Sequence, residues 1–290
     1  MAQLEICLRI SHMRDRVSVI VPNYNYGRYL KDCLLGILGQ THLNVEILFV
    51  DDGSTDDSVS IAREYSDKVT IICQPHGGVN QARNNGLRLA TGDFIAFCDS
   101  DDVWLPNKLT EQLGVFDKNP DLALVYCGIT VVDEKLNKLY QQDPIFSGEC
   151  EEYFFTNPAT AIVLLGASTS LIRKSAFKQE IFFDEALNLP AEDLDFFRRL
   201  AKGNRFDFIR EHLVLYRQHT VSASRVQTSK YFDGNRRHFL KLISDRKLQG
   251  KHKLNKQMWM RMHWQFIKRS LQEKNLILAI QQVKYMFKKV

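Results

Sequence analysis

Four short apolar runs recur along the first hundred residues, and each is followed at once by a polar segment. The runs occupy positions 17–22, 45–50, 69–73 and 93–98, and segments with apolar residues at helical spacing separate them. Strands that alternate with helices of about a dozen residues predict a mostly parallel sheet with helices on both faces. The chain is therefore expected to belong to the α/β class.

The polar segments after these runs mark one edge of the predicted sheet. They read PNYN from position 22, DDGS from 51, QPHGG from 74 and DSDD from 99. Ligands of open α/β sheets bind outside the carboxyl ends of the strands. We therefore expect these four segments, which are far apart in the sequence, to line one binding site.

The acidic segment after the fourth run is the strongest chemical signal in the chain. Asp99 and Asp101 are two positions apart, so on an extended backbone their carboxylates point the same way. Like charges this close repel, and each resists removal from water unless a cation lies among them. Mg²⁺ or Mn²⁺ is bound by one or two carboxylates together with phosphate oxygens of a substrate. The alternative is a solvated acidic turn before a helix that begins near Asn107.

Cysteine usage indicates a reducing environment. The six cysteines contain no CxxC pair and no zinc-ligand spacing, so neither a disulfide framework nor a zinc site is expected. Cys73, Cys98 and Cys127 lie in apolar runs, where a free thiol behaves as a small buried hydrophobic side chain. The first residues lack the pattern of a secretory signal. These features favour a cytoplasmic location.

Charge divides the 290 residues into two parts. From position 226 onward there are 16 Lys and Arg against 3 Asp and Glu, whereas the residues before it carry a net negative charge. This split predicts a boundary near position 225. Only helical patterns follow it, so 226–290 is expected to be a basic helical C-terminal region.

Four motifs give the chain a family resemblance. They read VSVIVPNYNYGRYLKDCLLGILGQT, VEILFVDDGSTDDS, GGVNQARNNGLRLATGDFIAFCDSDD and AEDLDFFRRL, in this order. Together they resemble glycosyltransferase family 2, the inverting sugar-nucleotide enzymes of the GT-A fold. The resemblance implies a GT-A catalytic domain at 16–225, with a nucleotide-binding half at about 16–105 and an acceptor half at about 106–225. Residues 1–15 precede it as an N-terminal extension.

The resemblance implies a nucleotide site after the first two strands. Pro22 and Tyr24 would lie against the nucleobase, with the Tyr24 ring stacked on it. Asp52 would accept a hydrogen bond from the base, with Asp51 next to it. The alternative for this segment is a capped turn between strand and helix, and capping does not exclude ligand contact.

Further residues acquire roles from the same resemblance. Arg83 would reach the nucleotide, although an isolated arginine on a helix more often pairs with a local carboxylate. Asp99 would contact the ribose or the metal, and Asp101 would be the main protein ligand of the metal. These assignments imply Mn²⁺ or Mg²⁺ as the cofactor.

The last motif implies the catalytic base. Asp193 would accept the proton of the acceptor hydroxyl, although Glu192 and Asp193 also suit a helix N-terminus through the helix dipole alone. His219 resembles a residue that closes over the diphosphate and metal, and Arg217 is a second candidate for the phosphate. A surface position for His219 is the alternative.

The basic region at 226–290 leaves two interpretations open. It is a helical appendage packed on the catalytic domain, or it attaches the protein to the inner face of an anionic membrane. No recognised nucleic-acid motif accompanies the charge, so nucleic acid is not expected as a partner.

These features together predict an inverting, metal-dependent glycosyltransferase. It would move a sugar from a nucleotide-sugar donor, with UDP favoured by family frequency, to a hydroxyl of a glycan or lipid-linked saccharide in cell-surface polysaccharide synthesis. The alternatives are a non-catalytic sugar-nucleotide-binding protein and a magnesium-dependent phosphohydrolase. The latter places its nucleophilic Asp after the first strand, where this chain has PNYN.

Overall fold

The computed structural model describes residues 15–151, 166–177, 182–187 and 191–219, together with positions 237, 241, 259–260, 263–264, 266–268, 270–271 and 275–286. The predicted N-terminal extension lies outside the described residues except for Asp15. No helix among the described residues is long and apolar enough to cross a membrane.

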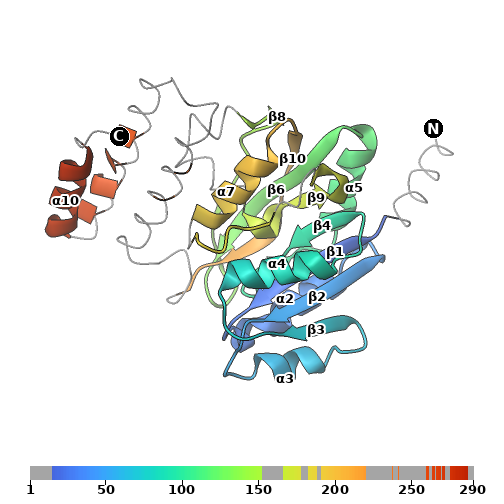
Figure 1. Cartoon of the computed structure of the whole chain (residues 1–290). Helices are drawn as coiled ribbons and strands as arrows, with labels where there is room; N and C mark the ends of the chain where they lie inside the picture. Colours follow the sequence, from blue (N-terminus) through green and yellow to red (C-terminus); the bar gives the residue numbers. More distant parts are fainter. Residues whose placement is uncertain are drawn as a thin grey trace.

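A ten-stranded sheet forms the centre of the protein (Figure 1). Its main path runs in the order β3-β2-β1-β4-β9-β6-β10-β5, while β7 pairs with β6 and β8 with β10. The α/β class and the four predicted strands are confirmed. The strands are β1 (Val17–Asn23), β2 (Val45–Asp51), β3 (Val69–Cys73), β4 (Phe94–Phe97), β5 (Val103–Trp104), β6 (Leu122–Val132), β7 (Lys138–Gln142), β8 (Gly148–Glu149), β9 (Leu171–Arg173) and β10 (Arg205–Arg217).

Most of the paired positions in the sheet are parallel, as predicted, and shorter strands pair antiparallel with this parallel part. Strands β3, β2, β1 and β4 are parallel, as the alternating pattern predicts, and β6 runs parallel to β10. Strand β9 joins these two parallel groups because it pairs antiparallel with both β4 and β6. The predicted nucleotide-binding and acceptor halves thus share one continuous sheet, and the division between them stays a prediction.

Helices cover both faces of the sheet. Helices α2, α3 and α5 contribute to one hydrophobic core, and α4 and α7 to a second core on the opposite face. Gly86 lets α4 approach β1 closely, because a Cβ there would lie 2.4 Å from the Ile20 side chain. The helices are α2 (Gly27–Leu38), α3 (Ser58–Arg63), α4 (Val79–Leu89), α5 (Lys108–Lys118), α7 (Ala191–Leu200) and α10 (Leu276–Met286).

The structure refines one local expectation and corrects another. The sequence STSLIRKSAF at 168–177 indicates a strand that runs into a helix. The strand is β9, with three residues, and the helix that follows it is a single 3₁₀ turn at Lys174–Ala176. Cys73 is exposed because it ends β3, the edge strand of the sheet. Cys98 and Cys127 are buried as free thiols, as expected.

Candidate active site

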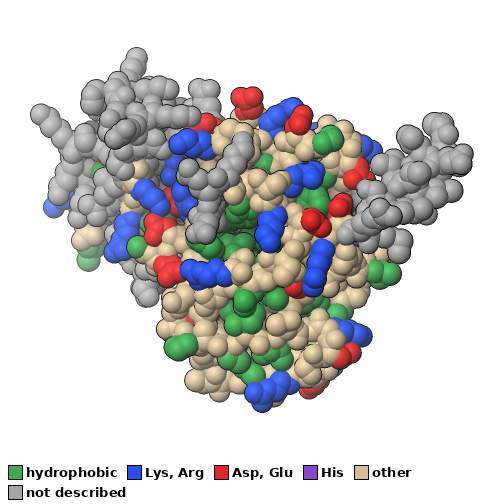
Figure 2. Space-filling model, turned by 45° about the vertical axis from the view of Figure 1, so that its right-hand side comes forward, with side chains coloured by type: hydrophobic (Ala, Val, Ile, Leu, Met, Phe, Trp, Pro, Cys, Tyr) green, Lys and Arg blue, Asp and Glu red, His purple; other side chains and the backbone are tan. Residues whose placement is uncertain are grey.

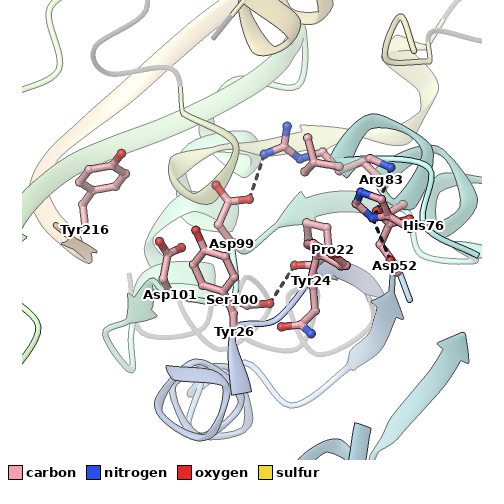
Figure 3. A pocket seen from close by; sticks show the side chains of 14 residues that line it. Pro22, Tyr24, Tyr26, Asp52, His76, Arg83, Asp99, Ser100, Asp101 and Tyr216 are labelled. Atoms are coloured by element: carbon pink, nitrogen blue, oxygen red, sulfur yellow. Dashed lines mark hydrogen bonds and ion pairs between the residues drawn. The ribbon is translucent and has the colours of Figure 1, made fainter. Parts of the chain in front are cut away.

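A cavity of about 250 Å³ opens at the carboxyl edge of the sheet (Figure 3). The segments that follow β1, β2, β3 and β4 all contribute to it, in agreement with the rule for parallel strands. Asp51, Asp193, Arg217 and His219 do not line this cavity. Six of the residues predicted for the site do line it, namely Pro22, Tyr24, Asp52, Arg83, Asp99 and Asp101.

Asp52 organises the loop that follows β3. Its carboxylate accepts hydrogen bonds from the backbone N–H groups of Gly77 and Gly78, both at 2.8 Å, and from the Gln74 side chain at 2.7 Å. Nδ1 of His76 lies 2.8 Å from the same carboxylate. Gly78 has a φ of +94°, a conformation that favours glycine. The Asp52 carboxylate is therefore fixed by this loop at the wall of the cavity.

Tyr24 has an aromatic neighbour that the sequence analysis missed. The His76 ring stacks on the Tyr24 ring, with centroids 4.1 Å apart and planes 26° apart. Both residues line the cavity and remain about half exposed. His76 belongs to the QPHGG segment, so its place at the site edge was predictable, but its stacking on Tyr24 was not.

Asp51 has a structural position behind the cavity wall. One carboxylate oxygen accepts a hydrogen bond from the Asn23 side chain at 3.1 Å, and the other accepts one from the backbone N–H of Ser54 at 3.0 Å. The side chain is buried. Asp51 thus ties the end of β1 to the turn after β2, which places Tyr24 and Asp52 beside each other.

Arg83 joins two carboxylates across the site. Its Nη1 donates a hydrogen bond to Asp193 at 2.7 Å and its Nη2 donates one to Asp99 at 2.9 Å. Burial alone would lower the pKa of Arg83, but the adjacent carboxylates raise it above the ordinary arginine value. The guanidinium group also lies over the Phe183 ring, 5.1 Å from its centroid. Arg83 is therefore a permanently charged bridge inside the protein.

Asp193 lies in the first turn of α7, on the far side of Arg83 from Asp99. Burial raises the pKa of the Asp193 carboxyl, the Arg83 charge lowers it and Asp99 raises it, and the net direction is upward. Its neighbour Glu192 is buried, and one oxygen of its carboxyl has no hydrogen-bond partner. Burial and the Asp193 charge raise the pKa of Glu192 to about 8. The two acids are therefore more than a charge complement to the helix dipole, because Asp193 forms an ion pair with Arg83 and Glu192 is a buried acid with a raised pKa.

Asp101 is held from the opposite side of the cavity. Oδ2 of its carboxylate lies 2.9 Å from Nε2 of His219, whose ring is buried against Tyr26 and Tyr29. Burial raises the pKa of Asp101, the His219 hydrogen bond lowers it, and repulsion from Asp99 adds to the rise. His219 is therefore a buried partner of Asp101 rather than a surface residue.

Tyr26 completes this side of the site, and the sequence analysis did not single it out. In Figure 3 its hydroxyl points toward the carboxylates of Asp99 and Asp101. Burial and the charges of these two residues raise the pKa of Tyr26. The signal was present in PNYNY, because Tyr26 directly follows a segment assigned to the binding edge.

Arg217 ends β10 and holds loops together behind the cavity. It donates hydrogen bonds to the backbone carbonyl groups of Asp101 and Glu134, at 2.9 and 2.7 Å, and to the Asp32 carboxylate at 2.9 Å. The guanidinium group lies 4.7 Å from the centroid of the Tyr29 ring. With its side chain buried, Arg217 positions the acidic segment and does not face the cavity.

The carboxylates of Asp99 and Asp101 suit a divalent cation. They line the same cavity and their charges repel each other. Among the described residues, no group of three or more His, Cys, Asp and Glu side chains is arranged around a common metal position. Mg²⁺ and Mn²⁺ need only one or two protein carboxylates when substrate phosphates and water supply the other ligands, so the residues present fit such an ion.

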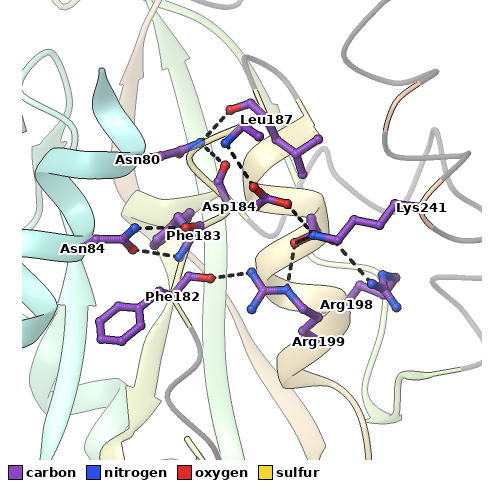
Figure 4. Close-up of polar contacts among 11 residues, drawn as sticks. Asn80, Asn84, Phe182, Phe183, Asp184, Leu187, Arg198, Arg199 and Lys241 are labelled. Carbon is purple, nitrogen blue, oxygen red and sulfur yellow. Dashed lines mark hydrogen bonds and ion pairs between the residues drawn. The ribbon is translucent and has the colours of Figure 1, made fainter. Parts of the chain in front are cut away.

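The segment 182–187 lies between the two helices that carry Arg83 and Asp193 (Figure 4). Asn80 of α4 donates hydrogen bonds to the carbonyl groups of Asp184 and Leu187, and Asn84 exchanges two with the Phe183 backbone. On the other side, Arg199 of α7 donates to the Phe182 carbonyl group. These contacts fix α4 and α7 relative to each other, and with them the Arg83–Asp193 pair.

Lys241 brings the C-terminal region into the same network. Its Nζ lies 2.6 Å from the Asp184 carboxylate and 3.0 Å from that of Asp195, which is fully buried in α7. Asp195 also pairs with Arg199 at 2.7 Å. Lys241 of the basic region therefore contacts α7, the helix whose first turn carries Asp193, the candidate base.

The α/β sheet flanked by helices matches that of solved GT-A glycosyltransferases. The family model described as Glycosyl transferase family 2 matches residues 18–180, more than half of the chain. The chain belongs to this family, which confirms the resemblance.

Curated relatives support the same assignment. An uncharacterized glycosyltransferase of Rickettsia prowazekii is 31% identical over 222 residues, which cover 75% of this chain and 69% of that protein. Glycosyltransferase GlyG of Streptococcus pneumoniae is 30% identical over 232 residues, covering 74% and 75%. An uncharacterized glycosyltransferase of a Nostoc species is 41% identical over 122 residues, which cover 41% of this chain and 38% of that protein.

Solved structures share the fold. TarS 1-349 of S. aureus, in complex with UDP-GlcNAc, superimposes with a TM-score of 0.69 at 20% identity, covering 92% of this chain and 79% of that one. The mannosyltransferase PcManGT from Pyrobaculum calidifontis, in complex with GDP-Man and Mn²⁺, gives a TM-score of 0.60 at 17% identity, covering 98% and 94%. The GT-A fold is therefore confirmed.

Proposed function

We propose that this glycosyltransferase moves a sugar from a UDP-sugar to a hydroxyl group, with inversion and with the help of Mn²⁺ or Mg²⁺. One observation carries the proposal. A single guanidinium group, that of Arg83, joins Asp99 in the cavity to Asp193 outside it. A donor bound over Asp99 would therefore have its reacting carbon close to a second, semi-buried carboxylate.

The nucleotide would bind between the first two strand ends. The Tyr24–His76 stack offers an aromatic surface for the base, with Pro22 beside it. Asp52 would accept a hydrogen bond from the base. Its oxygens already accept bonds from the 74–78 loop, but a carboxylate has about four acceptor positions. The neighbours TarS and PcManGT, which bind UDP-GlcNAc and GDP-Man, support a nucleoside diphosphate sugar as donor.

Asp99 and Asp101 would hold the divalent ion. When bound, such an ion neutralises the charge that develops on a leaving diphosphate. His219 orients the Asp101 carboxylate through its contact at 2.9 Å, and Arg217 fixes the backbone carbonyl group of Asp101. The Mn²⁺ complex of PcManGT supports this assignment.

Asp193 would accept the proton of the acceptor hydroxyl group. Burial raises its pKa, which makes the carboxylate a stronger base than a solvated aspartate. The Arg83 charge favours the ionised form of Asp193, and its hydrogen bond fixes one carboxylate oxygen. Because a single base acts on the face of the sugar opposite to the leaving group, the anomeric centre inverts.

The acceptor would be a glycan or lipid-linked saccharide of a cell-surface polysaccharide. The bridge of Lys241 to Asp184 and Asp195 supports a role for the basic C-terminal region beside the acceptor half. This arrangement would present the site to an acceptor at the inner face of a membrane.

A thermal-shift screen tests the donor assignment. The full chain is melted with UDP, GDP and dTDP sugars, each with and without Mn²⁺. Ligand binding to the folded state raises Tm. We expect UDP-sugars with Mn²⁺ to give the largest rise and the Asp101→Asn variant to lose the Mn²⁺-dependent part. Equal shifts for all three nucleotides, or shifts that Mn²⁺ does not change, would overturn the assignment.

Catalysis is separated from simple binding by the release of UDP. A binding protein would be stabilised by the donor without consuming it, whereas a transferase passes the sugar to an acceptor, or slowly to water, and releases UDP. Release that continues through many turnovers supports the proposal. A stable stoichiometric complex would contradict it.

A further inference from the structure

The C-terminal helix α10 has an outer apolar face that the proposed reaction does not use. The helix lies outside the sheet and the helices that cover it (Figure 1). Its inner residues Ala279 and Gln282 are buried. Ile277 is 74% exposed and Ile280 50% exposed. Among the side chains that the structure describes on α10, the exposed apolar ones are Leu276, Ile277, Ile280 and Val283.

The helical positions before α10 are divided in the same way. Trp259, His263, Phe266, Ile267 and Ser270 recur at helical spacing and are buried. Trp264, Lys268 and Leu271 follow each other at steps of four and three residues and are exposed. This segment therefore also has one buried and one exposed stripe.

The two exposed stripes lie on one side of the helix pair. Nδ1 of His263 lies 2.9 Å from the side-chain oxygen of Gln282, and the two residues are about equally far along the chain from position 273, so the helices run antiparallel. Around each helix axis, the exposed stripe lies about a third of a turn from the buried stripe, in the direction in which the chain advances. Two antiparallel helices that face each other advance in opposite directions, so these equal rotations bring both exposed stripes to the same side of the pair. We call this surface the C-terminal apolar face, which consists of Trp264, Leu271, Leu276, Ile277, Ile280 and Val283.

Positive charge surrounds the C-terminal apolar face. Lys268 and Lys284 are exposed beside it, and Nζ of Lys268 lies 5.8 Å from the centroid of the Trp264 ring. The sequence from 226 to 290 has 16 Lys and Arg against 3 Asp and Glu. By contrast, the part of the catalytic domain coloured in Figure 2 shows basic and acidic side chains interspersed. Apolar exposure and single-sign charge thus occur together in the C-terminal region.

We propose that the C-terminal apolar face docks on an anionic lipid bilayer. Helices that lie in the membrane interface bury an apolar face at the acyl boundary, while Lys and Arg attract acidic head groups. A second copy of this chain would bring two strongly positive regions together, which charge repulsion opposes. A nucleic acid would match the charge but would leave the aliphatic side chains without a partner, because its contacts are to phosphates and base edges.

Docking through this face gives the proposed acceptor a physical setting. Lys241 connects the C-terminal region to α7, the helix that carries the candidate base, so docking of this region would bring the catalytic domain to the bilayer. In this respect the inference deepens the proposed function. It stands on separate observations, however, and its test does not use the transfer reaction.

Vesicle co-sedimentation of the full chain tests the proposal. The probes are vesicles of phosphatidylcholine alone and of phosphatidylcholine with phosphatidylglycerol. The test variant is the double substitution Ile277→Gln and Ile280→Gln, since Gln keeps helix propensity. Leu43→Gln is the matched control, because Leu43 is 80% exposed and lies in the loop before β2.

The wild type and Leu43→Gln should bind the anionic vesicles and not the neutral ones, with binding that weakens as NaCl rises from 0.1 to 0.5 M. The double variant should bind at least tenfold more weakly, with its UDP-induced rise in Tm unchanged. Equal binding of the double variant and the wild type overturns the proposal, as does equal binding to neutral vesicles. A dimer in sedimentation velocity that the double variant abolishes, without vesicle binding, assigns the face to a second copy instead. Loss of UDP binding with retained vesicle binding would count against the proposed donor alone.

Discussion

Asp99 and Asp193, which lie in different halves of the sequence, accept hydrogen bonds from the two terminal nitrogens of one buried guanidinium group. Asp99 follows β4, a strand of the parallel group, and Asp193 lies in the first turn of α7. Arg83 therefore sets the distance between the position proposed for the donor and the position proposed for the base. Its positive charge also lowers the pKa values of Asp193 and Glu192, which burial raises.

Removal of the Arg83 charge should shift the pH dependence of the reaction. Arg83 lowers the pKa of Asp193, so Arg83→Met should let that pKa rise further. The base would then be ionised only at higher pH, and the acidic limb of the kcat/KM profile should move to higher pH. Arg83→Lys, which keeps the charge, should move it less. The profile is measured as UDP release across pH 5–9, and an unmoved limb in Arg83→Met would argue against Asp193 as the titrating group.

The stack of Tyr24 on His76 should contribute to nucleotide affinity. Stacking of a base on an aromatic side chain contributes about 1–3 kcal/mol in nucleic-acid systems, which corresponds to roughly 5- to 150-fold in Kd. Tyr24→Ala should weaken UDP binding within this range in calorimetric titration, while Tyr24→Phe should stay near the wild type. Tyr140→Ala is the control, because Tyr140 is similarly exposed but lies on β7. An unchanged Kd for Tyr24→Ala would place the base elsewhere.

Substitution of Arg217 should cost stability rather than affinity. Its guanidinium group is buried and bonds to Asp32 and to the Asp101 and Glu134 carbonyl groups. A hydrogen bond to a charged group typically contributes about 1.5–3 kcal/mol, so loss of these three bonds in Arg217→Met should lower Tm. UDP affinity, measured well below the new Tm, should stay within about threefold because Arg217 does not line the cavity. Arg210→Met on the exposed side of β10 is the control. A hundredfold loss of affinity at unchanged Tm would instead make Arg217 a phosphate ligand.

Lys108 should make stability rise with pH in the alkaline range. Its ammonium group is fully buried, lies 3.8 Å from the centroid of the Trp104 ring and donates to Gln112. Burial lowers the pKa of Lys108 from 10.5 to about 8. Between these values the unfolded chain binds the proton and the folded chain does not, so higher pH favours the folded state. The free energy of unfolding of the wild type should rise by about 1–3 kcal/mol from pH 8 to 10.5 relative to Lys108→Met. Denaturant titration at both pH values measures the free energy of unfolding, and Lys118→Met, at an exposed position, is the control. If the free energy of unfolding depends on pH in the same way in the wild type and in Lys108→Met, Lys108 is charged in the folded state.

The sequence predicted the elements of the site better than their contacts. Alternating apolar runs and helical spacing were sufficient for β1 to β4, α2, α4 and α7, because strand and helix periods are local properties. The antiparallel position of β9 between β4 and β6 was not predictable, because three residues are too few to show a strand period and their place depends on the two neighbouring strands. The 3₁₀ turns that flank β9 are equally short, so the sequence did not reveal their type.

Side-chain partners depend on tertiary distance, which single motifs do not contain. The sequence left open that Arg83 pairs with a local carboxylate. Arg83 does pair with carboxylates, but these are Asp99 and Asp193, which lie outside its own helix. Likewise, His219 is buried because its ring packs against Tyr26, at the N-cap of α2, and Tyr29, in its first turn. The loop sequence around His219 does not reveal these contacts. The residues were therefore identifiable from motifs, whereas their division into cavity-lining and supporting groups required the fold.

UDP release by the Asp193→Asn variant tests the central claim most directly. The variant keeps the size of the side chain and removes the proton acceptor. With Mn²⁺ and the UDP-sugar that most raises Tm, we expect UDP release at least about a hundredfold slower than in the wild type, the range of general base catalysis, with the Kd for UDP within threefold. Asp143→Asn, at an exposed carboxylate that pairs with His212, should release UDP at the wild-type rate. Release by Asp193→Asn at the wild-type rate would contradict the account.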